Sequence, residues 1–451
     1  MTLPLAHWLD AKRPADTLIA WQDDQRLTLA QLRADVARLM ARLQPQPGGR
    51  WALCCENSYG FTVALLATLH AGKTPVIPGH RRVALLDEQR DFFDGVISDV
   101  PLDWRGPRLV VDAATGDDVQ ARRMPAIGDD ATIALFTSGS TGKPKRIVKS
   151  VASLDREAAL LATRFGERLA ACRIVASVSP QHLYGLTFRI FLPMALGLPL
   201  LAPLLAFPEQ LAALDPASRY AFISSPAFLK RLDPHLAPPP LAMVLSAGGS
   251  LPWEEAERCA ARLGVWPDEI YGSTETGVLA WRFRQQENAL WQPFPGVRFT
   301  AQDDAFRVQS PLIDEVNGLL LEDALQFTAD GRFQLAGRRG RVVKIEEKRV
   351  ALDEIEQRLL ALDGIVEAAA LPLCRGGRQI VGALLVLDDA TRQRWQNGGA
   401  KTLERAWRQA LRAWIEPVAV PRQWRVVAAM PVNSMNKRVY AQLQELFHVT
   451  P

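Results

Sequence analysis

The chain has 451 residues, of which 48% are hydrophobic and 23% charged, so it can form two to four domains with large cores and is not a disordered protein. Its 53 basic and 49 acidic residues leave a net charge of only +4 without a basic patch, which argues against a nucleic-acid partner. Five cysteines without metal-ligand spacing, together with a start that lacks a signal peptide, predict a soluble cytoplasmic protein.

Strand-like and helix-like runs alternate over the first half of the chain. A helix is expected at Gly60–Ala71, and buried strands are expected at Trp51–Cys55, Thr74–Ile77, Val96–Ser98, Leu109–Val111, Ile133–Phe136 and Met243–Ser246. The apolar run Ile190–Phe207 has the length of a membrane span. Because prolines and a glycine interrupt it, we predict a buried helix followed by a buried strand instead. The alternation of strand-like and helix-like runs predicts an α/β fold with largely parallel sheets.

A glycine- and hydroxyl-rich loop follows the strand expected at Ile133–Phe136. Glycines let the backbone turn tightly and bring N–H groups to an anion, while hydroxyls and the charges of Lys143 and Lys145 add contacts to phosphate oxygens. The spacing of a Walker loop is absent. The sequence therefore predicts a phosphate-binding loop of another type, formed by Thr137, Ser138, Gly139, Ser140, Thr141, Gly142 and Lys143.

The segment Leu135–Lys145 resembles the signature of the adenylate-forming (AMP-binding) superfamily. This superfamily includes acyl- and aryl-CoA synthetases, adenylation domains of nonribosomal peptide synthesis, and luciferases. Five further motifs follow in the family's order, and the resemblance extends from Leu27 to Lys437. It implies a large N-terminal domain of layered α/β sheets, a small mobile α+β C-terminal domain, and the use of ATP and Mg²⁺.

The next motif, Ser179–Leu186, resembles the segment in which acyl- and aryl-CoA synthetases carry an aromatic or histidine gate at the substrate carboxylate. His182 would take that role, although a single histidine is commonly a structural residue. Amino-acid-activating domains usually place an aspartate near here to hold the substrate's ammonium group. The stretch Ser177–Gly185 contains none, which argues against an amino acid.

Two motifs follow that the resemblance connects with the nucleotide. Ser246–Pro252 resembles a glycine-rich wall for adenine and substrate, formed here by Gly248, Gly249 and Ser250. Tyr271–Gly277 resembles the second family signature. The resemblance implies that Glu275 helps to hold Mg²⁺, that Thr274 contacts phosphate, and that an aromatic residue packs on adenine, a role that falls to Tyr271 beside Gly272 and Ser273. A carboxylate is a suitable ligand for a hard cation next to phosphates.

Asp323 and Arg338 match the family's ribose-binding pair. Asp323 precedes the Asp330–Gly331 turn at the family's distance, and Arg338 follows a glycine as it does in the family. A carboxylate is well suited to accept hydrogen bonds from both hydroxyls of a ribose. The family's usual Thr-Gly before this aspartate is replaced here by Leu-Glu.

The last part of the chain has a different texture. Short strands are expected at Val342–Ile345, Val366–Leu371, Ile380–Leu387 and Arg425–Ala429, with helices at Leu352–Leu362 and 402–414. This mixture predicts a small α+β domain of residues 341–451 behind an adenylation core of residues 1–340. Arg341 falls where the family has its hinge, commonly an Asp or Lys.

The C-terminal motif Pro431–Lys437 resembles the one that carries the family's catalytic lysine, here Lys437. Two departures are visible: Asn436 replaces a glycine, and Glu346-Glu347 replaces a frequent Lys-Gly pair near the path of the acceptor thiol. A lysine in this place offsets negative charge on the reacting phosphate.

Taken with the resemblance, these residues predict an AMP-forming acid–thiol ligase. An aryl or fatty acid would be activated to an acyl-adenylate and then passed to the thiol of CoA or of an acyl carrier protein, as in acyl-CoA or acyl-ACP synthetases. Two alternatives stay open: a stand-alone amino-acid adenylation domain, and a catalytically degenerate nucleotide-binding protein. We expect no membrane span.

Overall fold

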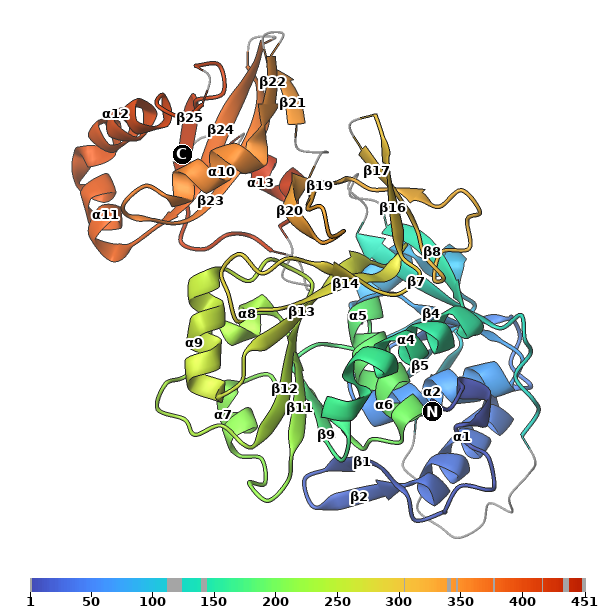
Figure 1. The fold of residues 1–451 in the computed structure, drawn as a ribbon. Coiled ribbons are helices and arrows are strands. Elements are labelled where there is room, and N and C mark those ends of the chain that lie inside the picture. Colours follow the sequence, from blue (N-terminus) through green and yellow to red (C-terminus); the bar gives the residue numbers. More distant parts are fainter. Residues whose placement is uncertain are drawn as a thin grey trace. The chain divides into compact units, whose positions relative to one another are not determined.

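The computed structural model describes residues 2–111, 124–138, 144–303, 305–338, 342–345, 348–375, 378–415, 417–432 and 438–447. Two compact units can be distinguished in the chain (Figure 1). The first comprises Met1–Arg298 and Gln309–Leu319, and the second comprises Phe299–Val308 and Leu320–Pro451. The domain boundary between residues 340 and 341 stays a prediction, and Arg341 itself lies outside the described residues.

Two large sheets organise the first unit. The order across the nine-stranded sheet is β15 (Gln292–Pro293), β14 (Gly277–Phe283), β13 (Pro267–Ser273), β12 (Leu241–Ser246), β11 (Tyr220–Ser224), β9 (Arg173–Ala176), β10 (Leu200–Leu201), β1 (Leu18–Gln22) and β2 (Gln25–Thr28). The order across the six-stranded sheet is β6 (Arg108–Val110), β5 (Gly95–Ser98), β3 (Arg50–Leu53), β4 (Thr74–Ile77), β7 (Thr132–Ser138) and β8 (Pro144–Ser150). Strands β13 to β1 and β6 to β7 pair in parallel.

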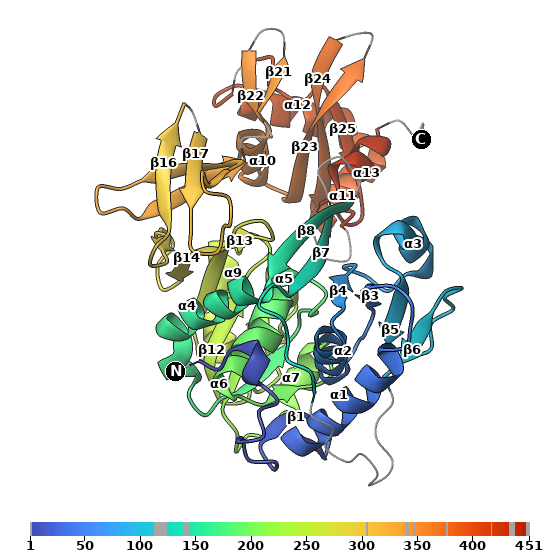
Figure 2. The ribbon, with the colours of Figure 1, turned by 90° about the vertical axis from the view of Figure 1, so that its right-hand side faces the viewer.

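Helices lie between and around these sheets (Figure 1 and Figure 2). They are α1 (Leu29–Leu43), α2 (Ser58–His70), α3 (Val83–Glu88), α4 (Val151–Leu169), α5 (Leu183–Gly185), α6 (Leu192–Leu196), α7 (Pro208–Ala212), α8 (Pro226–Leu229) and α9 (Trp253–Leu263). Every residue of α2 is buried, because this helix packs on strands β3, β4 and β5 and on the π-helical turn Leu186–Phe191, which in turn packs on β9. A helix that is apolar on all sides needs such cover.

The predicted α/β fold with layered, largely parallel sheets is confirmed. The strand expected at Thr74–Ile77 is β4, and the helix expected at Gly60–Ala71 is α2, shifted by a few residues at its start. The run Ile190–Phe207 forms the end of the π-helical turn, α6 and β10, and most of its apolar side chains enter the core as predicted, whereas Phe207 at its end is exposed. Among the described residues, no helix has the length and apolar character needed to cross a membrane.

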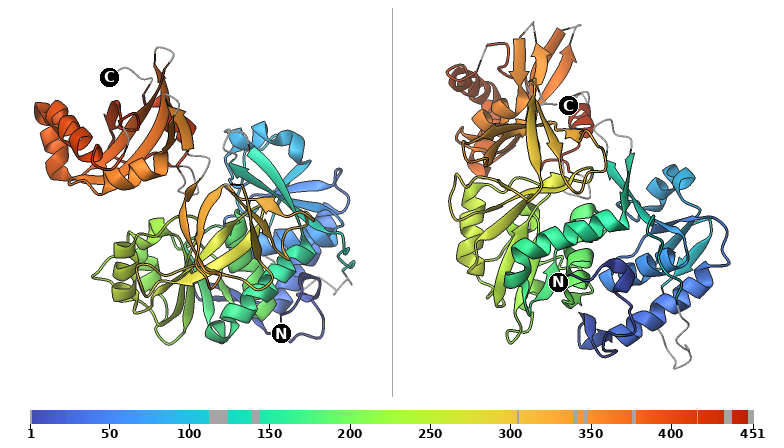
Figure 3. Two further views of the ribbon diagram at one scale, coloured as in Figure 1. Left: turned by 45° about the horizontal axis from the view of Figure 1, so that its top comes forward. Right: turned by 45° about the vertical axis from the view of Figure 1, so that its right-hand side comes forward.

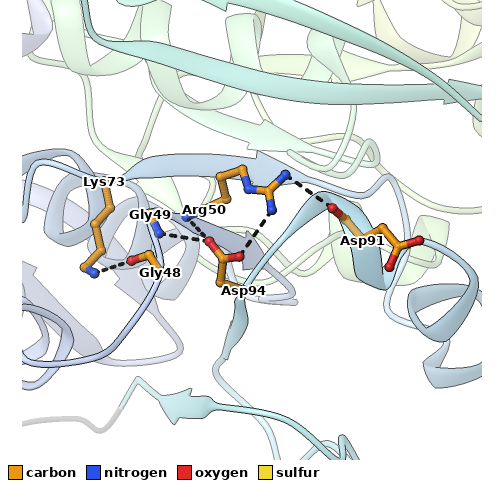
Figure 4. Close-up of polar contacts among 6 residues, drawn as sticks. All are labelled: Gly48, Gly49, Arg50, Lys73, Asp91 and Asp94. Atoms are coloured by element: carbon orange, nitrogen blue, oxygen red, sulfur yellow. Dashed lines mark hydrogen bonds and ion pairs between the residues drawn. The ribbon is translucent and has the colours of Figure 1, made fainter.

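The start of β3 is held by the carboxylate of Asp94, the residue just before the neighbouring strand β5 (Figure 4). Asp94 accepts hydrogen bonds from the backbone N–H groups of Gly49 (2.8 Å) and Arg50 (2.9 Å) and from the Arg50 guanidinium (3.2 Å). Partial burial raises the pKa of Asp94, but these hydrogen bonds outweigh it and hold the pKa below its ordinary value. Nearby, the Lys73 ammonium donates to the backbone carbonyls of Gln46 (2.8 Å) and Gly48.

The described residues of the second unit form small sheets with helices packed on them (Figure 3). Its strands are β16 (Arg298–Gln302), β17 (Ala305–Gln309), β18 (Leu319–Leu320), β19 (Asp323–Phe327), β20 (Phe333–Arg338), β21 (Val342–Ile345), β22 (Lys348–Ala351), β23 (Ile365–Arg375), β24 (Arg378–Leu387) and β25 (Gln423–Val426), and its helices are α10 (Leu352–Leu360), α11 (Asp389–Arg394), α12 (Ala400–Leu411) and α13 (Tyr440–Glu445). Alternate residues of β23 and β24 face α10 and α12 on one side and α13 on the other. The α+β texture predicted for the tail is therefore present.

The N-terminal segment is tied to α4 through Asp155, whose carboxylate accepts a hydrogen bond from the Leu5 N–H at 3.0 Å. Burial raises the pKa of Asp155 to about 6. The folded state therefore holds this proton more tightly than the unfolded chain, and the stability that it contributes is lost as pH rises from about 4 through 6.

We expect Asp155→Asn, which keeps the accepting oxygen, to raise the free energy of unfolding at pH 8 by on the order of 1 kcal/mol after allowance for solvent screening. The gain should shrink as pH falls to 5, as measured by denaturant unfolding at both pH values. Glu167→Gln, on the exposed side of the same helix, is the control. A gain for Asp155→Asn that does not depend on pH would contradict this account.

Candidate functional site

The predicted phosphate loop connects the two strands of an antiparallel pair, β7 and β8. Strands β7 and β8 pair over their whole length, with Thr137 opposite Lys145 and Ser138 opposite Pro144. The segment Gly139–Lys143, which includes Ser140, Thr141 and Gly142, lies outside the described residues. A strand follows this loop, whereas the helix N-terminus that follows a Walker loop would supply its own anion-binding N–H groups.

The second signature forms the tight turn between β13 and β14. Ser273 and Thr276 lock this turn, because the Ser273 N–H donates to Thr276 Oγ1 (3.0 Å) and the Thr276 N–H donates to Ser273 Oγ (3.2 Å). At Gly272, a Cβ atom would lie 2.2 Å from the carbonyl oxygen of Gly277, so only glycine allows this approach of the two strands. Thr274 and Glu275, between the locking residues, are both half-buried.

The two signatures meet through Lys145 and Glu275. The Lys145 ammonium lies 3.1 Å from Glu275 Oε1, and the two residues are 130 positions apart in the chain. Partial burial raises the pKa of Glu275, but the hydrogen bonds from Lys145 and Ser273 and the Lys145 charge more than offset this and hold the pKa below its ordinary value. Glu275 is therefore ionised at neutral pH and positioned beside the predicted phosphate loop's hairpin.

Behind this turn lie two buried charged residues that the sequence analysis missed. Lys149 is 5% exposed and donates to the carbonyl oxygens of Glu275 (2.7 Å) and Leu312 (3.4 Å). Glu157 is 2% exposed and accepts from the Val278 N–H (2.8 Å). Burial lowers the pKa of Lys149 and raises that of Glu157, while the attraction between the two charges opposes both shifts.

A sequence signal for Glu157 exists. It falls in the apolar stripe of α4, between the buried residues Leu154, Ala158 and Leu161. A carboxylate in such a stripe needs hydrogen-bonding partners inside the protein and so marks a buried polar network. Lys149 carries no comparable signal, because lysines four residues apart on a strand are common where that face of the strand is exposed to solvent.

The glycine-rich segment leaves the sheet next to the second signature. Strands β12 and β13 are parallel neighbours, with Ser246 opposite Glu269, so the segments that follow them emerge at the same edge. Gly248, Gly249 and Ser250 are exposed there, and Gly248 has a φ of +87°. Tyr271, at the end of β13, is half-buried, and its ring centroid lies 5.8 Å from that of Trp291.

His182 sits on a segment that is anchored to both sheets. On one side of it, Gln181 Nε2 donates to the Leu53 carbonyl of β3 at 2.8 Å. On the other, the Tyr184 hydroxyl lies 2.9 Å from the Ser224 carbonyl of β11. The His182 ring lies beside Gly79, where an added Cβ would be 3.4 Å from His182 Cε1 and 3.5 Å from the Phe136 carbonyl of β7. The histidine is thereby held next to the strand that leads into the predicted phosphate loop.

The predicted ribose pair lies in the second unit. Asp323 and Arg338 are direct partners in the register of β19 and β20, so the two residues stand side by side although fifteen positions separate them in the chain. Gly337, just before Arg338, has a φ of +109° and lies close to Asp353, which explains the glycine of this motif. The predicted residues Lys437 and Arg341, and the departures Glu346, Glu347 and Asn436, lie outside the described residues.

A sequence model of the AMP-binding enzyme family matches residues 89–318, which is half of the chain. The chain therefore belongs to the AMP-binding enzyme family, as the signature motifs predict, and is an AMP-forming ligase that activates an acid. A 4-coumarate–CoA ligase of Rhodobacter capsulatus is 29% identical over 326 residues, which cover 70% of this chain and 76% of the relative.

Two further comparisons extend over more of the chain. A 4-hydroxybenzoate–CoA/benzoate–CoA ligase of Rhodopseudomonas palustris is 26% identical over 429 residues and covers 78% of each protein. The crystal structure of ATP-bound MatB from Rhodopseudomonas palustris superposes with a TM-score of 0.82 at 20% identity and covers 99% of both chains. At this identity the likeness concerns the fold alone.

Gly277, at the end of the signature turn, tests how closely this turn packs against Glu157. Gly277 has a φ of +67°, and an added Cβ would lie 2.8 Å from Glu157 Oε1 and 3.0 Å from Leu312 Cδ1. Gly264 has a φ of +69° but no atom within 4 Å of the same point. The two glycines have nearly the same φ, but only at Gly277 would a methyl group collide with its surroundings.

We expect Gly264→Ala to lower the free energy of unfolding by about 1 kcal/mol from backbone strain alone. Gly277→Ala should lower it by about 2–4 kcal/mol, because overpacking adds to the strain. Chemical denaturation of both variants measures the difference. Equal losses would show that the turn does not press on Glu157.

Proposed function

We propose that this enzyme activates an aryl or fatty acid with ATP and then transfers the acyl group to the thiol of CoA or of an acyl carrier protein. The contact between Lys145 and Glu275, 3.1 Å apart, carries this proposal, because it joins the hairpin of the first signature to the turn of the second. The hairpin and the turn are far apart in the chain, and their contact brings a lysine and a carboxylate together. Such polar groups suit a nucleotide's phosphates.

Several groups would receive ATP. The loop of residues 137–143 would hold its phosphates, with Thr274 as a further contact. The exposed backbone of residues 248–250 and the ring of Tyr271 would flank adenine. Asp323 and Arg338 would bind the ribose hydroxyls, since a carboxylate accepts from both. The cross-strand pairing of Asp323 with Arg338 supports that last assignment.

A magnesium ion would be held by Glu275. Among the described residues, no group of three or more His, Cys, Asp or Glu side chains could hold a metal. A single carboxylate, that of Glu275, suits Mg²⁺, because this ion takes one or two carboxylates together with substrate phosphates and water. The ion would neutralise phosphate charge, and Lys145 would release the carboxylate to it. The depressed pKa of Glu275 keeps that carboxylate ionised.

The chemistry requires positioning rather than a protein nucleophile. A carboxylate oxygen of the acid attacks the α-phosphorus, and the bond to pyrophosphate breaks. Lys437 would offset negative charge at that phosphorus, and His182 would contact the acid's carboxylate. In the second step the thiol attacks the acyl carbonyl and AMP leaves, after a rotation at Arg341. Asn436, which replaces a glycine before Lys437, tolerates the left-handed backbone that this glycine allows.

The class of acid and the acceptor are supported by the relatives. Their names specify 4-coumarate, 4-hydroxybenzoate and benzoate as the acids and CoA as the acceptor. The absence of an aspartate from Ser177–Gly185 agrees with an acid that carries no ammonium group. We therefore favour an aryl acid and CoA, with an acyl carrier protein as the second acceptor to test.

Replacing the proposed catalytic lysine should separate the two half-reactions. Lys437→Ala should abolish acid-dependent pyrophosphate release, because one preorganised contact to the transition state is typically worth about 3–4 kcal/mol. Thiol transfer from preformed adenylate should persist. Lys401→Ala, at an exposed lysine of the same unit, is the matched control. Normal pyrophosphate release by Lys437→Ala would remove this residue from the mechanism.

A further inference from the structure

A buried lysine, Lys149, contacts the backbone of the signature turn between β13 and β14. Lys149 lies four residues after Lys145 on β8, so both side chains leave the same face of this strand. The exposed Lys145 reaches the Glu275 carboxylate, whereas the buried Lys149 reaches the Glu275 backbone carbonyl at 2.7 Å. One strand therefore contacts both ends of the same glutamate.

Glu157 completes this support from α4. Its Oε1 accepts from the Val278 N–H at 2.8 Å, and its Oε2 accepts from the Thr187 hydroxyl at 2.8 Å. The turn thus has a hydroxyl lock between Ser273 and Thr276, a cation on the carbonyl of Glu275 and an anion on the N–H of Val278. These contacts fix the backbone on both sides of the proposed magnesium ligand.

Stability alone does not explain these buried charges. Removing two charges from water costs about as much as their attraction returns, and apolar replacements of buried ion pairs are often neutral or stabilising. What these two charged groups do provide is a defined backbone geometry, because each has few ways to satisfy its hydrogen bonds inside the protein.

We propose that Lys149 and Glu157 are positioning residues for nucleotide binding with magnesium: by holding the backbone from Glu275 to Val278, they orient the Glu275 carboxylate towards the cation. This inference rests on the proposed function. It assigns Lys149 no contact with ATP, so its loss acts through the direction of the Glu275 side chain and leaves the nucleotide's metal-independent contacts intact.

The test is the gain in ATP affinity that magnesium provides, measured by calorimetry with ATP in the presence of Mg²⁺ and again in EDTA. We expect Lys149→Met to reduce this gain by about tenfold, the size of one lost charge-assisted hydrogen bond, and to leave ATP affinity in EDTA within about twofold of wild type. Lys73→Met is the matched control, because Lys73 also donates to two backbone carbonyls of the first unit, those of Gln46 and Gly48, and contacts Gly48 before β3 rather than the signature turn (Figure 4).

Lys149→Met leaves Glu157 buried without its counter-charge and can unfold the chain. The double variant Lys149→Met/Glu157→Gln removes both charges while the amide keeps the hydrogen bonds to Val278 and Thr187, so it should fold and still show the reduced gain. A wild-type gain in either folded variant, or equal losses with and without Mg²⁺, would overturn the inference. If wild type binds ATP with magnesium but releases no pyrophosphate with any acid, the proposed function fails while the binding result for Lys149 stands.

Discussion

The contact of β8 with the turn after β13 is the interaction on which the site in the first unit depends. Lys145 and Lys149 leave one face of β8 and meet Glu275 through its carboxylate and its carbonyl. Without these contacts, the hairpin of the six-stranded sheet and the hairpin of the nine-stranded sheet would present their signatures separately. The proposed binding of nucleotide phosphates and magnesium would need donors and a carboxylate in one place, and opposite charges provide the attraction that brings them together.

Buried charge also fixes β13, the strand that carries this turn. Its consecutive acids Asp268 and Glu269 point to opposite faces. Arg168 of α4 lies 2.7 Å from Asp268, while Arg282 and Arg284 lie 2.7 Å and 3.4 Å from Glu269. Burial raises the pKa of both acids, and these arginines oppose the shift. A shift of register by one residue would exchange the two faces and separate each acid from its partner, so these pairs define the register of β13.

Local patterns were enough to predict much of the fold. Short continuous apolar runs predict β4 and α2, because the residues of these elements are almost all buried. Motif spacing predicts Glu275, Asp323 and Arg338. Glu157 carries a local signal, because it is a carboxylate within the apolar stripe of α4, but Lys149 carries none. Lys149 contacts a carbonyl of a distant turn, and Glu157 contacts the Val278 N–H and the Thr187 hydroxyl. No spacing along the chain encodes which distant groups these side chains meet.

The most direct measurement of the central claim is ATP–pyrophosphate exchange by the wild-type enzyme with a panel of aryl, fatty and amino acids, followed by thiol transfer to CoA and to an acyl carrier protein. The account predicts exchange that depends on an aryl or fatty acid, with no response to amino acids, and formation of a thioester. Exchange driven only by amino acids, or binding of ATP without exchange for any acid, would contradict it.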